Sequence, residues 1–166
     1  MSALPAYILP EANPMDVMEA LASLRGWCFD RPGDDEVNMT VEGSWSDLHV
    51  CMNWRDDLES VHLAATFDLR VPVSRREEIS RLVSLINEQL FIGHFDLWRQ
   101  DGALMFRNGM FLTGGAEILP EQCESLLVSA LESCERYYPA FQFVLWAGQS
   151  AEEAIQSCLL ETQGEA

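Results

Sequence analysis

Residues 14–25 carry their apolar positions at helical spacing, which predicts a first helix. Asn13 suits the N-cap of this helix and Pro14 suits its first position. Gly26 ends the helix or lies in its last turn. Residues 1–13 show no periodic pattern and contain two prolines, so we expect a flexible N-terminal arm there.

Apolar and polar residues then begin to alternate, which is typical of half-buried strands. Strands are predicted over about residues 37–41, 48–54 and 61–69. Gly43-Ser44 is expected to form a two-residue turn that places Met39 opposite Leu48. Residues 31–35 are expected to form a loop. These segments predict a three-stranded antiparallel meander with one apolar face.

Helical spacing returns at residues 74–90, where Ser74 and Glu77 have the spacing of a capping box. A third helix is predicted from Pro120, and Pro139 is expected to end or kink it. The segment between the second and third predicted helices needs an interpretation of its own.

The segment between these helices predicts a β-hairpin. Asp101-Gly102 is a strong signal for a two-residue type I′ turn. This turn would place Asp96 opposite Arg107, so that the two charges attract across the strands. A run that contains a histidine, an aspartate and two arginines therefore does not require a catalytic site.

The predicted order is helix, three strands, helix, two strands and helix, which is an α+β fold. Ser150 and Glu153 form a further capping box before a short final helix. We expect a flexible arm at residues 1–13, a single α+β domain at residues 14–147, and a short helix with a frayed tail at residues 148–166.

The composition narrows the classes of partner. The chain has 166 residues, a formal net charge of −17, and ten basic residues that are all arginine. Without a basic stripe, binding to nucleic acid or to an anionic membrane is not expected. The charge indicates either a self-repelling surface or an acidic face for a basic partner. Five cysteines without a Cys-x-x-Cys pair, no signal peptide and no membrane-length apolar run predict a reducing cytoplasm.

No motif predicts catalysis or a cofactor. No glycine-rich phosphate loop follows a predicted strand, and paired carboxylates occur only in turns or in the first turns of helices. His49 and Cys51 share the polar face of one strand, and His62 is expected opposite Cys51. These three side chains could hold zinc or copper, or they could be ordinary polar residues on a sheet face.

Large apolar residues occupy both faces of the second hairpin. One face belongs to the predicted core, and the other carries the residues Ile92, Trp98, Met105 and Phe111. These four residues are candidate contacts for a partner or for a second copy of the chain. A helix that covers this face within the same chain is the alternative.

Three segments resemble the YbjN family of bacterial proteins. They are NEQLFIGHFDLW at residues 87–98, DGALMF at residues 101–106, and ERYYPAFQFVLW at residues 135–146. The resemblance covers about residues 14–155 and implies a fold similar to that of type III secretion chaperones. It implies an acidic bacterial cytoplasmic protein, a homodimer that binds other proteins and acts as a sensory transduction regulator. It supplies no catalytic motif, and Asn87 and Gly93 match positions that we interpret as structural.

The leading hypothesis is therefore a non-enzymatic, chaperone-like protein-interaction module. The alternatives are a sensor that binds a metal or small ligand at His49, Cys51 and His62, a dedicated secretion chaperone, and an enzyme without a recognised motif.

Overall fold

A computed structural model of the protein describes residues 13–164. The predicted N-terminal arm therefore lies almost wholly outside the described residues. The elements in chain order are α1 (Pro14–Arg25), β1 (Cys28–Gly33), β2 (Glu36–Val41), β3 (Leu48–Arg55), β4 (Ser60–Arg70), α2 (Arg76–Asn87), β5 (His94–Trp98), β6 (Ala103–Phe111), α3 (Pro120–Leu145) and α4 (Ala151–Gly164). The predicted α+β class is confirmed.

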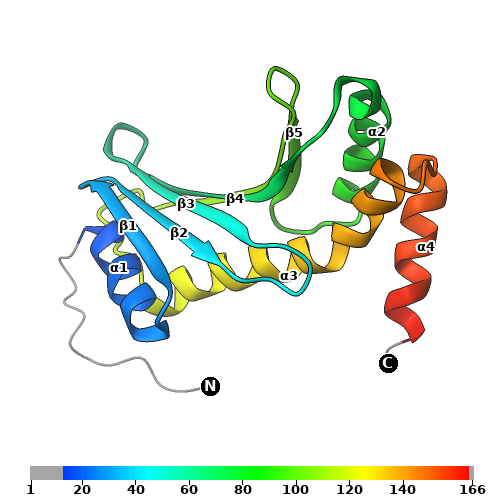
Figure 1. Ribbon diagram of the computed structural model, residues 1–166. Coiled ribbons are helices and arrows are strands. Elements are labelled where there is room, and N and C mark those ends of the chain that lie inside the picture. Colours follow the sequence, from blue (N-terminus) through cyan, green and yellow to red (C-terminus); the bar gives the residue numbers. More distant parts are fainter. Residues whose placement is uncertain (1–12, 165–166) are drawn as a thin grey trace.

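One antiparallel sheet holds all six strands in the order β1-β2-β3-β4-β6-β5. The sheet curves strongly, and α1 and α3 lie against its convex face (Figure 1). Helix α2 packs beside β5, and α4 packs against α2 and α3. The concave face of the sheet points away from these helices (Figure 1).

The prediction of a loop at residues 31–35 is wrong for residues 31–33, because β1 extends to Gly33 and adds a strand to the predicted order, and only Asp34 and Asp35 form a turn. Phe29 lies opposite Met39 of β2 and packs against the core. Arg31 forms ion pairs with Asp16 and Glu19 of α1, at 2.5 and 2.6 Å. Because Pro32 lies within residues 28–33, their sequence gave little sign of a strand. The tertiary contacts of this strand with α1 and β2 hold it in place.

The core lies between the convex face of the sheet and the helices. Its centre is a group of aromatic rings with centroid separations between 5.3 and 6.3 Å: Phe67, Phe95, Phe106, Tyr137, Tyr138 and Phe141. All six side chains are buried. Each large buried side chain contributes roughly 1.5–3 kcal/mol relative to exposure, so this group fixes how α3 sits on the sheet.

The predicted turn between the first two strands is too short. Residues 42–47 form the connection, and Met39 lies opposite Val50 instead of Leu48. Helix α3 explains the longer loop, because Glu135 accepts a hydrogen bond from the Ser44 amide at 2.8 Å. The register shifts by two residues, which leaves every side chain on its predicted face.

The β5–β6 hairpin shows the same kind of error. Its loop comprises residues 99–102, and Phe95 lies opposite Phe106. The Val71 amide donates a hydrogen bond to the carbonyl oxygen of Gly102 at 2.8 Å. Gly102 has a φ of +76°, and a Cβ there would lie 2.5 Å from the Val71 oxygen. The loop therefore needs glycine at this position because it packs against the segment that leads into α2.

Two structural positions from the sequence are confirmed at the start of β5. The Asn87 side chain accepts a hydrogen bond from the Phe95 amide at 2.8 Å and donates one to the Phe95 carbonyl at 3.0 Å. Gly93 has a φ of +72°, and a Cβ there would lie 2.2 Å from the Phe106 ring. The Asn87 side chain thus forms the backbone hydrogen bonds that a neighbouring strand would otherwise form. Gly93 allows the backbone to approach the Phe106 ring closely.

The helix ends agree with the sequence in part. The Asn13 side chain accepts a hydrogen bond from the Met15 amide at 2.8 Å, and Gly26 adopts the left-handed conformation. The capping box at Ser150 is confirmed, whereas the one predicted at Ser74 is wrong because a 3₁₀ turn over Val73–Arg75 precedes α2.

For α3, one of the two predicted effects of Pro139 is excluded, and α4 is longer than predicted. Helix α3 continues through Pro139 to Leu145, and its last turns bend toward α2 (Figure 1). The proline therefore does not end the helix. Helix α4 continues to Gly164, past residue 162 where fraying was expected.

Candidate functional site

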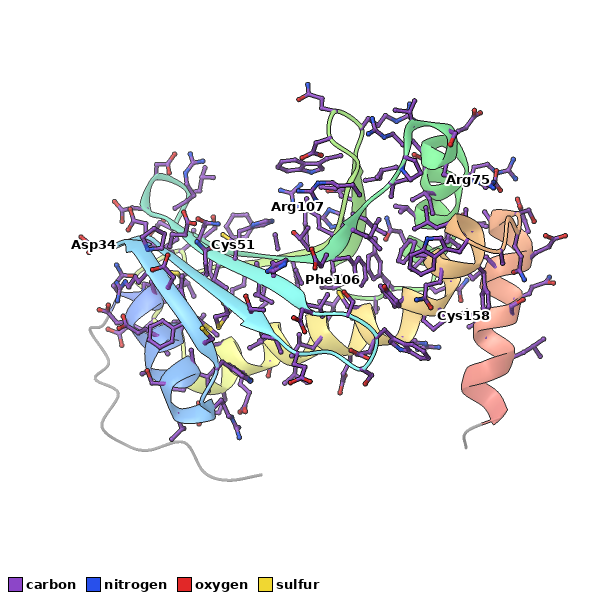
Figure 2. The ribbon with its side chains drawn as sticks, in the orientation of Figure 1. Asp34, Cys51, Arg75, Phe106, Arg107 and Cys158 are labelled. Carbon is purple, nitrogen blue, oxygen red and sulfur yellow. The ribbon has the colours of Figure 1, made fainter. Side chains whose placement is uncertain are left out.

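The open face is the name we give to the concave side of the sheet, from which alternate side chains project away from the core. It includes the residues Asn38, Thr40, His49, Cys51, Asn53, His62, Thr66, Asp96, Trp98, Met105, Arg107 and Phe111. Figure 2 shows Cys51 and Arg107 on this side of the sheet and Phe106 on the opposite side. In the part of the chain that the structure describes, the helices lie on the convex side.

Two hollows lie on the open face. The larger, of about 770 Å³, lies between the β1–β2 turn, the β3–β4 turn and β6, and its polar lining residues are Asp34, Asp35, Glu36, Asn53, Arg55, Ser60, His62 and Arg107. The smaller, of about 310 Å³, lies over β1, β2 and β3 and includes His49 and Cys51 in its lining. Both hollows are open, so their charged groups are accessible to a partner.

A chain of hydrogen bonds crosses the open face from β4 to β5. Arg107 donates from Nε to His62 Nε2 at 3.1 Å and from Nη1 to Asp96 Oδ2 at 3.0 Å. His94 lies 3.3 Å from the same Asp96 oxygen. The predicted ion pair of Asp96 and Arg107 is therefore confirmed, although it runs diagonally because Arg107 lies opposite His94.

The surroundings of His62 favour its neutral form. Because Arg107 donates to Nε2, this nitrogen carries a lone pair and the ring proton lies on Nδ1. Burial, and then the charges of Arg107 and His94, lower the pKa of His62 from its ordinary value. The imidazole thus acts as a hydrogen-bond acceptor that holds the arginine in place.

The three candidate metal ligands do not converge. His62 lies opposite Asn53, and Cys51 lies opposite Ala64, so the predicted pairing of His62 with Cys51 is wrong. The cause is the connection between β3 and β4, where a 3₁₀ turn and a left-handed Glu59 lengthen the loop. Among the residues that the structure describes, no group of three His, Cys, Asp or Glu side chains is placed to hold a metal.

Cys51 and His49 instead make local polar contacts. The Asn53 side chain donates to Cys51 Sγ at 3.1 Å, and burial raises the pKa of this thiol. His49 lies 3.5 Å from the Thr40 hydroxyl and 3.9 Å from an Asp68 oxygen. A binding role for His49, Cys51 and His62 remains a prediction.

The four candidate contacts for a partner lie in different settings. Trp98 is 52% exposed and Phe111 is 73% exposed, whereas Met105 is only 6% exposed. Trp98 and Phe111 are separated by eight positions of β6, which is about 26 Å of strand. Ile92, at 57% exposure, lies near α3 and not on the open face. The four residues therefore do not form one patch, and Met105 is too enclosed to serve as a contact.

The sequence predicted the Asp96–Arg107 pair of the charged network but not its contact with His62. That contact joins Arg107 of β6 to His62 of β4, two strands that pair although α2 and β5 lie between them in the chain. The sequence also did not predict that Asp34 and Asp35 line the larger hollow, because β1 was not predicted. No spacing signal in the sequence gives this strand order.

No helix in the described part of the chain is both long and apolar enough to cross a membrane.

The comparison with known families decides the relationship. The model of the YbjN family, described as "Putative bacterial sensory transduction regulator", matches residues 14–143. The chain belongs to the YbjN family. No curated protein sequence matches it.

Two solved structures share the YbjN fold of this chain. The crystal structure of YbjN from E. coli, described as "a putative transcription regulator", superposes with a TM-score of 0.54 at 12% identity, covering 73% of this chain and 85% of the other. A chain in the crystal structure of the ExsC–ExsE complex superposes with a TM-score of 0.50 at 18% identity, covering 75% and 92%. These similarities establish the fold, and the predicted type III secretion chaperone-like fold class is confirmed.

Proposed function

We propose that this YbjN-family chain is a non-enzymatic, chaperone-like protein-interaction module that binds a partner protein through the open face of its sheet. One observation carries the proposal: the helices cover one face of a curved sheet, while the other face keeps Trp98 and Phe111 exposed. The regulator description of the family and the complex formed by ExsC support it.

The chemistry of the open face suits a protein partner. Trp98 and Phe111 offer large apolar surfaces at two ends of the face, and buried aromatic side chains contribute much of the affinity in protein interfaces. Between them lie the polar groups of His62, Arg107 and Asp96. An apolar anchor next to polar groups is the usual arrangement of an interface.

The net charge of −17 favours a basic or neutral partner over an acidic one. A homodimer is part of this proposal, as is a location in the bacterial cytoplasm, where the five cysteines would stay reduced. A dedicated secretion chaperone would bind one dominant partner, whereas a general regulator would bind several.

Affinity capture from the native cell, with identification of the bound proteins, tests the proposal. Trp98→Asp should reduce capture at least about tenfold, because a charge replaces a large apolar contact. Trp146→Asp is the matched control, because Trp146 is 68% exposed at the end of α3. Circular dichroism checks that both variants fold, and light scattering reports the dimer.

Equal capture by the wild type and by Trp98→Asp would remove the open face as the binding site. Capture of no protein at all would overturn the proposed function. In that case the hollow of about 310 Å³ beside His49 and Cys51 would favour the small-ligand sensor instead.

A further inference from the structure

Strand β6 extends beyond its neighbour β5. Strand β5 pairs with residues Ala103–Arg107 of β6, while β4 pairs with β6 as far as Phe111. The four residues from Asn108 to Phe111 therefore have a neighbouring strand on one side only. We name this segment the overhang.

The hydrogen-bond pattern shows which backbone groups of the overhang point away from β4. The Leu112 amide donates to the Glu59 carbonyl of the β4 side at 2.7 Å. Because such bonds alternate along an antiparallel pair, Asn108 and Met110 also point toward β4. Gly109 and Phe111 then point toward the vacant side. The Gly109 amide is bonded at 2.8 Å to the side chain of Asn108, as expected for a donor without a strand partner.

The outer edges of the sheet are protected from pairing with another chain, whereas the overhang is not. Asn87 occupies both backbone groups of Phe95 on the outer edge of β5. Strand β1, at the opposite edge, contains Pro32 and an irregular register between Asp30 and Gly33. Proline and bulges are the usual means by which an edge resists pairing with another chain. The overhang has neither, and its two outward residues are exposed.

A groove of about 370 Å³ lies between the overhang and α3. Its lining residues are Ile92, Asn108, Gly109, Met110, Gln122, Ser125, Leu126 and Ser129. Ile92, Met110 and Leu126 make its floor apolar. Since side chains alternate along a strand, an added strand would direct every second side chain into this groove.

The charges beside the groove favour a basic occupant. Glu121 and Glu132 are exposed on α3 at the two ends of the helical stripe that lines the groove, about 16 Å apart along the helix axis. Neither carboxylate forms an ion pair within the described part of the chain. A second copy of the chain would bring another charge of −17 to the same place, which disfavours self-association here.

We propose that the overhang accepts an extended, positively charged segment of a partner protein as an added strand in line with β5. The segment forms backbone hydrogen bonds with the Gly109 carbonyl and with both backbone groups of Phe111, places small apolar side chains in the groove, and directs flanking basic side chains to Glu121 and Glu132. The inference rests on the proposed function and specifies how the partner is held. A helical segment does not fit, because its backbone groups are already bonded to each other.

A synthetic peptide tests this arrangement without knowledge of the natural partner. The probe is fluorescein-labelled acetyl-Arg-Arg-Val-Thr-Val-Arg-Arg-amide, whose valines and terminal arginines lie on one side of an extended strand. We expect saturable binding by fluorescence anisotropy to the full chain. The matched peptide with glutamate at every arginine should bind at least about tenfold more weakly.

Selective N-methylation of the peptide tests the backbone register. The threonine would lie opposite Gly109 or Phe111 and direct its amide toward β6, so methylation of that amide should weaken binding at least about tenfold. The valine amides point away from β6, and their methylation should have little effect. Equal effects at the two positions would overturn the proposal, and this measurement needs no variant of the protein.

The Phe111→Pro variant tests the backbone hydrogen bonding between the peptide and β6 by a change in the protein. Proline removes an amide that β4 does not use and places its ring over the edge, so peptide binding should be lost. Phe111→Ala is the control, because it removes the aromatic ring and keeps the amide, and it should bind the peptide measurably. Retained binding by a folded Phe111→Pro variant would overturn the proposal.

The remaining outcomes separate this inference from the proposed function. No binding of the basic peptide, with partner capture intact, rejects the overhang and leaves the open face. Self-association that Phe111→Pro abolishes would identify a second copy as the occupant and would also reject the proposed segment. Loss of partner capture that is at least about tenfold greater in Phe111→Pro than in Phe111→Ala supports the inference, because the alanine variant loses only the aromatic contact of the open face.

Discussion

At the scale of single residues, His62 shows how a side chain can be held in one protonation state. Its Nε2 accepts the hydrogen bond from Arg107, and protonation of this atom would end the bond and place two positive charges together. His94 adds a further positive potential when it is charged. The neutral imidazole is therefore the form that the open face favours.

This arrangement predicts a specific pH dependence of stability. The pKa of His62 is lowered in the folded state, so its contribution to stability is complete above about pH 6.5 and is lost as the pH falls through the folded pKa. His62→Gln keeps an acceptor for Arg107 without a titrating ring. We expect the urea midpoint of this variant to fall less than that of the wild type between about pH 7.5 and about pH 5.

His49→Gln is the matched control, because it removes an imidazole on the same face that accepts no hydrogen bond from an arginine. A wild-type pH dependence in His62→Gln would show that this histidine does not hold the arginine in the way described.

At the scale of elements, the sequence predicted which face each side chain occupies better than it predicted partners across strands. Phe95 and Phe106 lie in the core directly opposite each other. The predicted register, which set Asp96 opposite Arg107, would have placed Phe95 opposite Asn108 on the same face. Errors of two residues preserve the face because side chains alternate with a period of two.

The origin of those errors is long-range. The loop at residues 42–47 is set by Glu135 of α3, and the loop at residues 99–102 is set by Val71. Local turn propensity at Gly43-Ser44 and Asp101-Gly102 could not include these contacts. The contact between His62 and Arg107 depends on the pairing of β4 with β6, so this part of the candidate site was also beyond local patterns.

The first turn of α4 gives an element-scale prediction. The Ala151 amide donates to Glu78 Oε1 of α2 at 2.6 Å, so a carboxylate from another helix caps α4. Glu78→Ala leaves that amide without its partner and should destabilise the protein by about 1 kcal/mol, measured by urea unfolding. Glu77→Ala, in the same turn of α2, should have a smaller effect because Glu77 makes no contact of this kind.

Hydrogen exchange locates the expected change. In Glu78→Ala, amides in the first turn of α4 should exchange faster than in Glu77→Ala. Equal unfolding midpoints for the two variants would show that Ser150 and Glu153 alone suffice to cap this helix.

At the scale of the whole molecule, the dominant feature is the excess of negative charge. Twenty-seven acidic residues face ten arginines. Among the residues that the structure describes, the arginines that form ion pairs with carboxylates are Arg25, Arg31, Arg55, Arg81 and Arg107. These pairs are at least partly exposed, and exposed pairs contribute only about 0–1 kcal/mol each. They compensate locally for a charge that acts over the whole surface.

This balance predicts that salt stabilises the protein. Sodium chloride weakens both the few attractive pairs and the general repulsion, and at a net charge of −17 the repulsion is the larger sum. The urea midpoint at neutral pH should therefore rise between about 0.02 M and about 0.5 M sodium chloride. Potassium chloride should give the same rise, because screening depends on ionic strength and not on a bound cation. A midpoint that falls with salt would mean that the arginine pairs, and not the surplus of carboxylates, control the electrostatic part of the stability.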